Sequence, residues 1–220
     1  MKNKQSNDVI EKGLCVLEKI CLISQSEVQK DHIEQALNLD RISYNDTYHL
    51  SLNTCLSYFD KNNQIYIMAL DETKTAVLGY INFSPVTEKM YKKIKSGHVI
   101  DTVIKSSDIV SYVDGVDCWG YMSSIVVHPD HRNRGIAKRM LMLLQKQICI
   151  LAMEHNIFFK SIIADAVSDL GAYILTEIGY MKIKTSNHDT KIMELNLFNE
   201  STVKTEYNKE MIDIYRKREK

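Results

Sequence analysis

Residues 120–147 read GYMSSIVVHPDHRNRGIAKRMLMLLQKQ, and this stretch decides the fold of the chain. Its apolar, β-branched beginning, Tyr121 to Val127, is typical of a buried strand. Pro129 cannot donate a hydrogen bond to a β-ladder and ends the strand, while Gly135 marks a place where the backbone takes an unusual φ or closely approaches another group. After Gly135, apolar residues recur at helical spacing, with basic and polar residues mostly on the other side. The stretch therefore predicts a strand, a turn, a basic loop and an amphipathic helix.

The start of this predicted helix is suited to binding phosphate. An α-helix leaves the N–H groups of its first turn without partners inside the helix, and its dipole makes that end positive. Arg132, Arg134 and Lys138 add positive charge there. Two common phosphate loops are excluded, because the chain has no GxxxxGK[ST] and no GxGxxG after a strand. The pattern that remains is Arg-x-x-Gly-x-Ala after an apolar strand ending in Val-x-Pro.

This combination of strand, loop and helix resembles the coenzyme A pyrophosphate loop of the GNAT superfamily of acyl-CoA-dependent N-acyltransferases. The second signature of that superfamily, a helix followed by a glycine, an aromatic residue and a strand, is matched by Gly171 through Ile178-Gly179-Tyr180. The resemblance covers about residues 64–198 and fits the helices before them only loosely. It implies an α/β (α+β) fold with a central twisted sheet of about six to seven strands, mixed but mainly antiparallel. Helices flank that sheet, which splays apart at its fourth strand to admit the cofactor.

Composition and charge favour a protein that binds neither nucleic acid nor membrane. The chain has 220 residues, and 28 Lys plus Arg balance 28 Asp plus Glu, so its formal net charge is zero. No apolar run is long enough to cross a bilayer, and the beginning, MKNKQSNDVIEKG, lacks the apolar core of a secretory signal. The five cysteines are odd in number and lack CxxC spacing, which is typical of reduced thiols. We therefore expect a cytoplasmic location.

The chain is expected to form one domain. We divide residues 1–220 into N-terminal helices at 1–63, a core at 64–198 with an insertion at 86–117, and a helical tail at 199–220. The N-terminal part holds one helix capped by Ser26 and a second from about Thr47 to Phe59. Before them, residues 7–23 fit either a helix or a first strand within Gly13 to Leu22. The tail has an apolar side, which either docks on its own domain or contributes to a homodimer.

Short β-branched and aromatic runs mark the strands of the core. They lie at Gln64 to Leu70, Ala76 to Phe83, Tyr121 to Val127, Ser161 to Ala164, Tyr180 to Thr185 and Lys191 to Phe198. The insertion holds a predicted helix at Glu88 to Lys95 and an irregular piece around Ile100 to Val113. In the superfamily this region often helps to form the acceptor pocket. The resemblance therefore places acceptor specificity there and in the helices at 27–59.

Acyl transfer from a thioester to an amine needs an anchored cofactor, a polarised carbonyl, a deprotonated amine and a reprotonated thiolate. The resemblance implies that the fourth strand, the loop and the start of the next helix bind acetyl-CoA. The implied cofactor-binding residues are Ile125, Val126, Val127, Arg132, Asn133, Arg134, Gly135, Ile136, Ala137, Lys138 and Ser168. It also implies a strand distortion at Ile125 to Val127, with the Val127 N–H as the leading donor to the thioester carbonyl.

The two usual proton-transfer residues of the superfamily are absent. Many relatives carry a glutamate four residues before the Val of Val-x-Pro, where this chain has Ser123. Many also carry a tyrosine four residues before the glycine of the second signature, where this chain has Leu175. The catalytic candidates that remain are Tyr121, Ser123 and Tyr173, and for each tyrosine the alternative is core packing with its hydroxyl satisfied.

Two further expectations concern geometry and metals. Strand alternation predicts that Tyr121 and Ser123 share a face with Ile125 and Val127. The paired histidines of the HxxH motif, at 128 and 131, flank a proline turn and not a helix face, so we expect no metal site there.

The leading hypothesis is an acetyl-CoA-dependent N-acetyltransferase that acts on a primary amine of a small molecule or protein by direct attack on the thioester. It would be an acyltransferase that transfers groups other than aminoacyl groups. The absent proton-transfer residues motivate one alternative, an acyl-CoA-binding sensor or scaffold without catalysis. A second alternative is an acyltransferase for a longer acyl chain. The acceptor is not encoded in a motif, because acceptor pockets are assembled from loops. Acyl chain length, oligomeric state and biological role likewise carry no motif.

Overall fold

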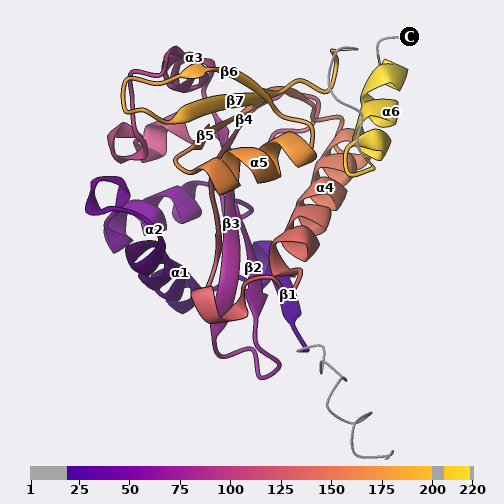
Figure 1. Ribbon diagram of the computed structural model, residues 1–220. Helices are drawn as coiled ribbons and strands as arrows, with labels where there is room; N and C mark the ends of the chain where they lie inside the picture. Colours follow the sequence, from indigo (N-terminus) through magenta and orange to yellow (C-terminus); the bar gives the residue numbers. More distant parts are fainter. Residues whose placement is uncertain (1–18, 200–205, 219–220) are drawn as a thin grey trace, which may run out of the picture.

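A single seven-stranded sheet forms the centre of the molecule, with strand order β1-β2-β3-β4-β5-β7-β6 (Figure 1). The computed structural model describes residues 19–199 and 206–218. The strands are β1 (Cys21–Ser24), β2 (Tyr66–Leu70), β3 (Val77–Val86), β4 (Cys118–Val127), β5 (Phe159–Ala166), β6 (Met181–Thr185) and β7 (Lys191–Leu195). Only the pair β4 and β5 runs parallel, and every other neighbouring pair is antiparallel. The expected mixed, mainly antiparallel sheet is confirmed.

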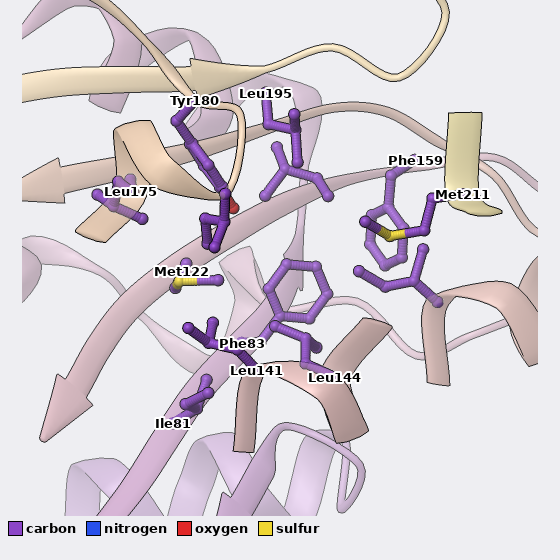
Figure 2. Packing of buried hydrophobic residues seen from close by; sticks show 14 of the residues in the cluster. Ile81, Phe83, Met122, Leu141, Leu144, Phe159, Leu175, Tyr180, Leu195 and Met211 are labelled. Atoms are coloured by element: carbon purple, nitrogen blue, oxygen red, sulfur yellow. The ribbon is translucent and has the colours of Figure 1, made fainter. Parts of the chain in front are cut away.

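Helices cover both faces of the sheet (Figure 1). They are α1 (Lys30–Ser43), α2 (Leu52–Lys61), α3 (Glu88–Ser96), α4 (Ile136–Glu154), α5 (Asp169–Glu177) and α6 (Lys209–Arg218). The first three pack on one face and form what we call the α1 core. The last three pack on the other face and form the α4 core, where side chains of the sheet meet those of α4, α5 and α6 (Figure 2).

The N-terminal helices begin later than the sequence predicts. Residues 25–27 form a 3-10 turn, so α1 starts at Lys30 with Gln29 as its N-cap, not with Ser26. The helix predicted from Thr47 is α2, which starts at Leu52 because the Ser51 side chain accepts a hydrogen bond from the Thr54 N–H. Most of the predicted first strand, together with Cys15, lies outside the described residues, and β1 is the part that is described.

The sheet opens between β4 and β5. Their pairing runs from Cys118 opposite Phe159 to Met122 opposite Ala164 and then stops, although β4 continues to Val127. On its other side β4 stays paired with β3 as far as Val127. The last residues of β4 therefore have a neighbour on one side only, which is the splay that the resemblance implies.

A β-bulge at Ser123 corrects the predicted alternation of β4. Asn82 of β3 lies opposite Ser124, and the next residue of β3 lies opposite Met122, so Ser123 is an extra residue. An extra residue exchanges the faces of all side chains after it. Tyr121 consequently packs in the α1 core, whereas Ile125 and Val127 pack against the α4 core. The prediction that these residues share a face was wrong, because the distortion falls earlier than Ile125.

The described part of the tail docks on its own chain. Met211, Ile212 and Tyr215 of α6 are buried in the α4 core. The Phe159 N–H donates to the Tyr215 hydroxyl at 2.9 Å, and the Tyr207 hydroxyl donates to the Leu141 carbonyl at 2.9 Å. The apolar side of the described part of the tail is thus covered within the molecule, so it gives no support to the homodimer, which stays a prediction. No helix in the described ranges combines the length and the apolar character needed to span a membrane.

Candidate active site

A cavity of about 1180 Å³ lies where β4 and β5 part. It connects the two faces of the sheet, because its lining comes from α4 and α5 on one side and from α1 on the other. We call one part the loop end, lined by residues 125–127 of β4, by 131–133 and 135–138, and by α5. We call the other part the aspartate end, lined by Asp40, Asp101 and Asp165 together with several tyrosines.

The start of α4 is open towards the loop end. Its N-cap is Gly135, with φ 75°, no side-chain cap and no acidic residue in the first turn. A Cβ added at Gly135 would meet nothing within 4 Å, so open space lies beside this backbone. The first N–H groups of α4, at Ile136 to Lys138, have no acceptor within the helix. These groups line the cavity and can receive a phosphate.

The two arginines of the loop have different positions. Arg132 lines the cavity, and its Nε donates to the Val127 carbonyl oxygen at 3.1 Å, which ties the loop to the end of β4. The Arg134 Nη2 donates to the Asp130 carbonyl oxygen at 2.9 Å, and Arg134 is not part of the cavity lining. Of the pair, Arg132 is therefore better placed to contact a bound anion.

The unpaired side of β4 offers main-chain groups to the cavity. The His128 N–H donates to the Leu78 carbonyl oxygen at 2.9 Å, which sets the alternation of hydrogen bonds between β3 and the end of β4. In that alternation the main-chain N–H and C=O groups of Val126 point towards β3. The N–H groups of Ile125 and Val127 point to the open side of β4, where no strand is paired. The Tyr44 hydroxyl lies at the Ile125 main chain and the Ser124 side chain. The Val127 N–H faces the gap from which β5 has diverged, as its proposed oxyanion role requires.

Of the three catalytic candidates, Tyr121 is the one joined to an ionisable group. It is 2% exposed, and its hydroxyl donates to the Asp101 carboxylate. Burial raises the pKa of Asp101 to about 7, although the hydrogen bond from Tyr121 works against that rise. Burial also raises the pKa of Tyr121 well above its usual value, so its hydroxyl stays protonated. The pair can accept a proton at Asp101 near neutral pH.

The other candidates are engaged or exposed. The Ser123 hydroxyl donates to Asn82 Oδ1 at 2.9 Å. Tyr173 lines the loop end from α5 and is 61% exposed. Ser168 is the N-cap of α5, where its Oγ accepts from the Gly171 N–H at 3.0 Å, which leaves the hydroxyl hydrogen for another partner. Leu175 is buried in the α4 core, so no acid replaces the usual tyrosine there.

Sequence reasoning missed the three aspartates. Asp40 comes from α1, Asp101 from a 3-10 turn in the insertion and Asp165 from β5. Only the expectation that the insertion and the N-terminal helices form the acceptor pocket pointed towards two of them. Among residues 19–199 and 206–218, no group of three His, Cys, Asp or Glu side chains is arranged to hold a metal ion.

Comparisons with known proteins agree with this geometry. Residues 30–149, more than half of the chain, match the acetyltransferase (GNAT) family. The chain therefore belongs to the GNAT acetyltransferase family. No curated protein matches it.

Solved structures of similar fold include three with different descriptions. The loading GNATL domain of CurA from Lyngbya majuscula is 9% identical, with a TM-score of 0.57 over 81% of this chain and 98% of that chain. The NatC complex bound to Gag peptide and CoA is 14% identical, with a TM-score of 0.54 over 80% and 96%. Mosquito arylalkylamine N-acetyltransferase like 5b is 13% identical, with a TM-score of 0.52 over 81% and 100%. At these identities the likeness shows the fold.

Proposed function

We propose that this protein is an acetyl-CoA-dependent N-acetyltransferase that transfers an acetyl group to a primary amine by direct attack on the thioester. One observation carries the proposal: the uncapped start of α4 and the unpaired side of β4 open into the same cavity. This arrangement fits both the phosphates and the amide-rich arm of an acyl-CoA. A cytoplasmic location is part of the proposal and is supported by the cysteines of the described residues, which are free thiols.

The cofactor would be anchored mainly by main-chain groups. The N–H groups of Ile136 to Lys138 would receive the pyrophosphate, with the Arg132 guanidinium and the Lys138 ammonium adding positive charge. The main-chain groups of Ile125, which face the open side of β4, would hold the pantetheine arm, whereas those of Val126 are turned towards β3. The Val127 N–H would donate to the thioester oxygen and stabilise the negative charge that develops there.

The reaction itself needs a neutral amine. The acceptor ammonium would lose its proton to the Asp101 carboxylate, which the Tyr121 hydroxyl orients by its hydrogen bond. The amine nitrogen then bonds to the acetyl carbon, the oxyanion forms at the Val127 N–H, the C–S bond breaks to release the CoA thiolate, and the nitrogen releases its extra proton to solvent to give the neutral amide. Tyr173 is our candidate for the acid that reprotonates this thiolate, because it lines the cavity from α5.

Calorimetric titration with acetyl-CoA tests the proposal, with ATP as a phosphate-bearing control. We expect saturable binding of acetyl-CoA, no response to ATP, and release of free thiol when an amine is added. The variant Gly135→Asp places a carboxylate beside the phosphate site and should weaken acetyl-CoA binding by at least about 100-fold. Gly115→Asp is the matched control, since Gly115 also has a positive φ of 76° and open space around its Cβ but lies outside the cavity lining.

The outcomes separate the competing functions. Absence of acyl-CoA binding by the folded wild-type protein would refute both the enzyme and the sensor. Binding without thiol release on any amine would favour the acyl-CoA sensor or scaffold. Tighter binding and faster turnover of longer acyl-CoAs would replace the acetyl donor in the proposal.

A further inference from the structure

Three carboxyl groups from distant parts of the sequence line the aspartate end of the cavity. They belong to Asp40, Asp101 and Asp165. Asp165 follows Ile163 on β5 by two residues and therefore faces the α1 side of the sheet, where Tyr121 also lies. The negative charges of Asp165 and Asp40 contribute to the raised pKa of Asp101, which places the three groups within electrostatic reach of one another.

The partners of these carboxyls are mostly neutral. The Tyr80 hydroxyl donates to Asp40, as the Tyr121 hydroxyl does to Asp101. The Asp165 Oδ1 atom is buried and has no hydrogen-bond partner among the described residues. Burial raises the pKa of Asp40 to about 6 and also raises the pKa of Asp165. A buried carboxylate without a compensating charge is costly, so this end of the cavity is built to receive positive charge.

Burial outweighs the influence of the two histidines nearest to these carboxyls. His49 lowers the pKa of Asp40 and His188 lowers that of Asp165, but each effect is smaller than that of burial. His49 also approaches exposed Asp46 at 3.4 Å. Within the described lining, Arg132 and Lys138 are the Lys and Arg side chains, and both belong to the loop end. The lining thus has its Lys and Arg side chains at the loop end, while Glu177 of α5 and Glu206 also line the cavity, and no Lys or Arg of the described lining belongs to the aspartate end.

We propose that the acceptor is a small polyamine-type molecule, a primary amine that carries at least one further ammonium group, held by Asp40, Asp101 and Asp165. The proposal rests on the function proposed above. A single ammonium compensates one negative charge, and each ammonium donates up to three hydrogen bonds. Three carboxylates are thus better matched by a molecule with two or more positive charges. A peptide with one N-terminal ammonium would leave most of the acidic charge uncompensated.

Binding measurements on the protein loaded with CoA test this inference without requiring turnover. The probes are 1,4-diaminobutane and the triamine spermidine, compared with 1-aminobutane and 4-amino-1-butanol at pH 8. We expect the diamine and the triamine to bind at least about tenfold more tightly than either monoamine, by the charge argument. The same order is expected for kcat/KM in the thiol-release assay.

Matched variants locate the effect. Asp40→Asn and Asp165→Asn should each reduce the preference for the diamine by about tenfold, because each removes one negative charge without changing side-chain size. Glu34→Gln is the control, since Glu34 is an exposed acid on the same helix as Asp40 and does not line the cavity. Thermal unfolding and acetyl-CoA affinity report whether each variant is folded.

The failures of the two proposals are distinguishable. Equal affinity for diamine and monoamine, or an unchanged preference in both aspartate variants, would overturn the polyamine-type acceptor while leaving the acetyltransferase intact. Failure to bind acetyl-CoA would overturn the proposed enzyme. In that case the diamine is titrated into the protein without cofactor, and tight binding there would still support a polyamine site.

Discussion

The two ends of the cavity are built in different ways. The loop end is built from main-chain N–H groups of one continuous stretch, from the end of β4 to the start of α4. The aspartate end is built from side chains of α1, the insertion and β5, which are far apart in sequence. The contrast explains why the proposed cofactor site has a recognisable sequence motif while the proposed acceptor site has none. Binding through main-chain N–H groups depends on the conformation of one short stretch. The acidic character of the aspartate end depends on side chains that only the fold brings into one cavity.

The largest expected effect comes from the aspartate end. Asp101→Asn should lower kcat by about 100-fold, because a positioned base contributes at least that much to typical proton transfers. Wild-type activity should fall as pH drops through about 7, where Asp101 becomes protonated. Initial-rate measurements between pH 5.5 and 9 would check both expectations.

The variant Tyr121→Phe tests whether Asp101 sets the acidic limb of the activity profile. The hydrogen bond from Tyr121 lowers the pKa of Asp101, so its removal should move the acidic limb of the activity profile to higher pH. If Asp101→Asn loses activity but the acidic limb of the pH profile stays at the same pH in Tyr121→Phe, that limb does not report the protonation of Asp101.

The same carboxyl should make the protein less stable at alkaline pH. Its folded pKa of about 7 lies above the ordinary value of 3.8, so folding favours the protonated form. The stabilising contribution is fully present below about pH 4 and is lost as pH rises through about 7. Asp101→Asn should therefore be more stable than wild type by about 2 kcal/mol at pH 8 and similar to it at pH 4.

Urea denaturation of both proteins at the two pH values measures this difference. A stability gain that is equal at both pH values would point to packing and not to the buried charge. Activity and stability are thus expected to change in opposite directions in one variant, which is common where a buried charge serves catalysis.

At the loop end, Arg132→Ala should raise the KM for acetyl-CoA by about tenfold and change kcat less. A charge-assisted hydrogen bond contributes about 1.5–3 kcal/mol, of which about 1.4 kcal/mol corresponds to a factor of ten. Arg134→Ala is the comparison, since Arg134 lies outside the cavity lining. An equal rise in KM for both variants would mean that general positive charge, and not the position of Arg132, attracts the cofactor.

The smallest effect on activity is expected from a substitution of Ser123, the extra residue at the β-bulge. Ser123→Ala should change kcat/KM by no more than about twofold, because the Ser123 hydroxyl is bonded to Asn82 and the main chain of β4 faces the open side. Steady-state kinetics would check it. A loss of tenfold or more would give the Ser123 side chain the proton-transfer role that its position in β4 first suggested.

Much of the loop end was predictable from residues 120–147 alone. A strand stopped by Pro129, a positive-φ glycine at Gly135 and an amphipathic helix are local features, and the structure has all three. The splay followed from the family resemblance. The bulge did not, because the extra residue at Ser123 is defined only by its register against β3. The prediction that Tyr121 and Ile125 share a face was therefore wrong, because the bulge places them on opposite faces.

The chain's own order of residues thus determined the strand, the turn and the helix of residues 120–147, because these depend on short-range backbone conformation and hydrophobic periodicity. Its resemblance to the GNAT superfamily implied the fold class and the proposed cofactor site. The tertiary structure alone decided the acidic character of the aspartate end. Asp40, Asp101 and Asp165 are unremarkable in sequence, and only packing brings their carboxyls into one partly buried cavity. Burial there raises the pKa of each, which an isolated stretch of sequence does not encode.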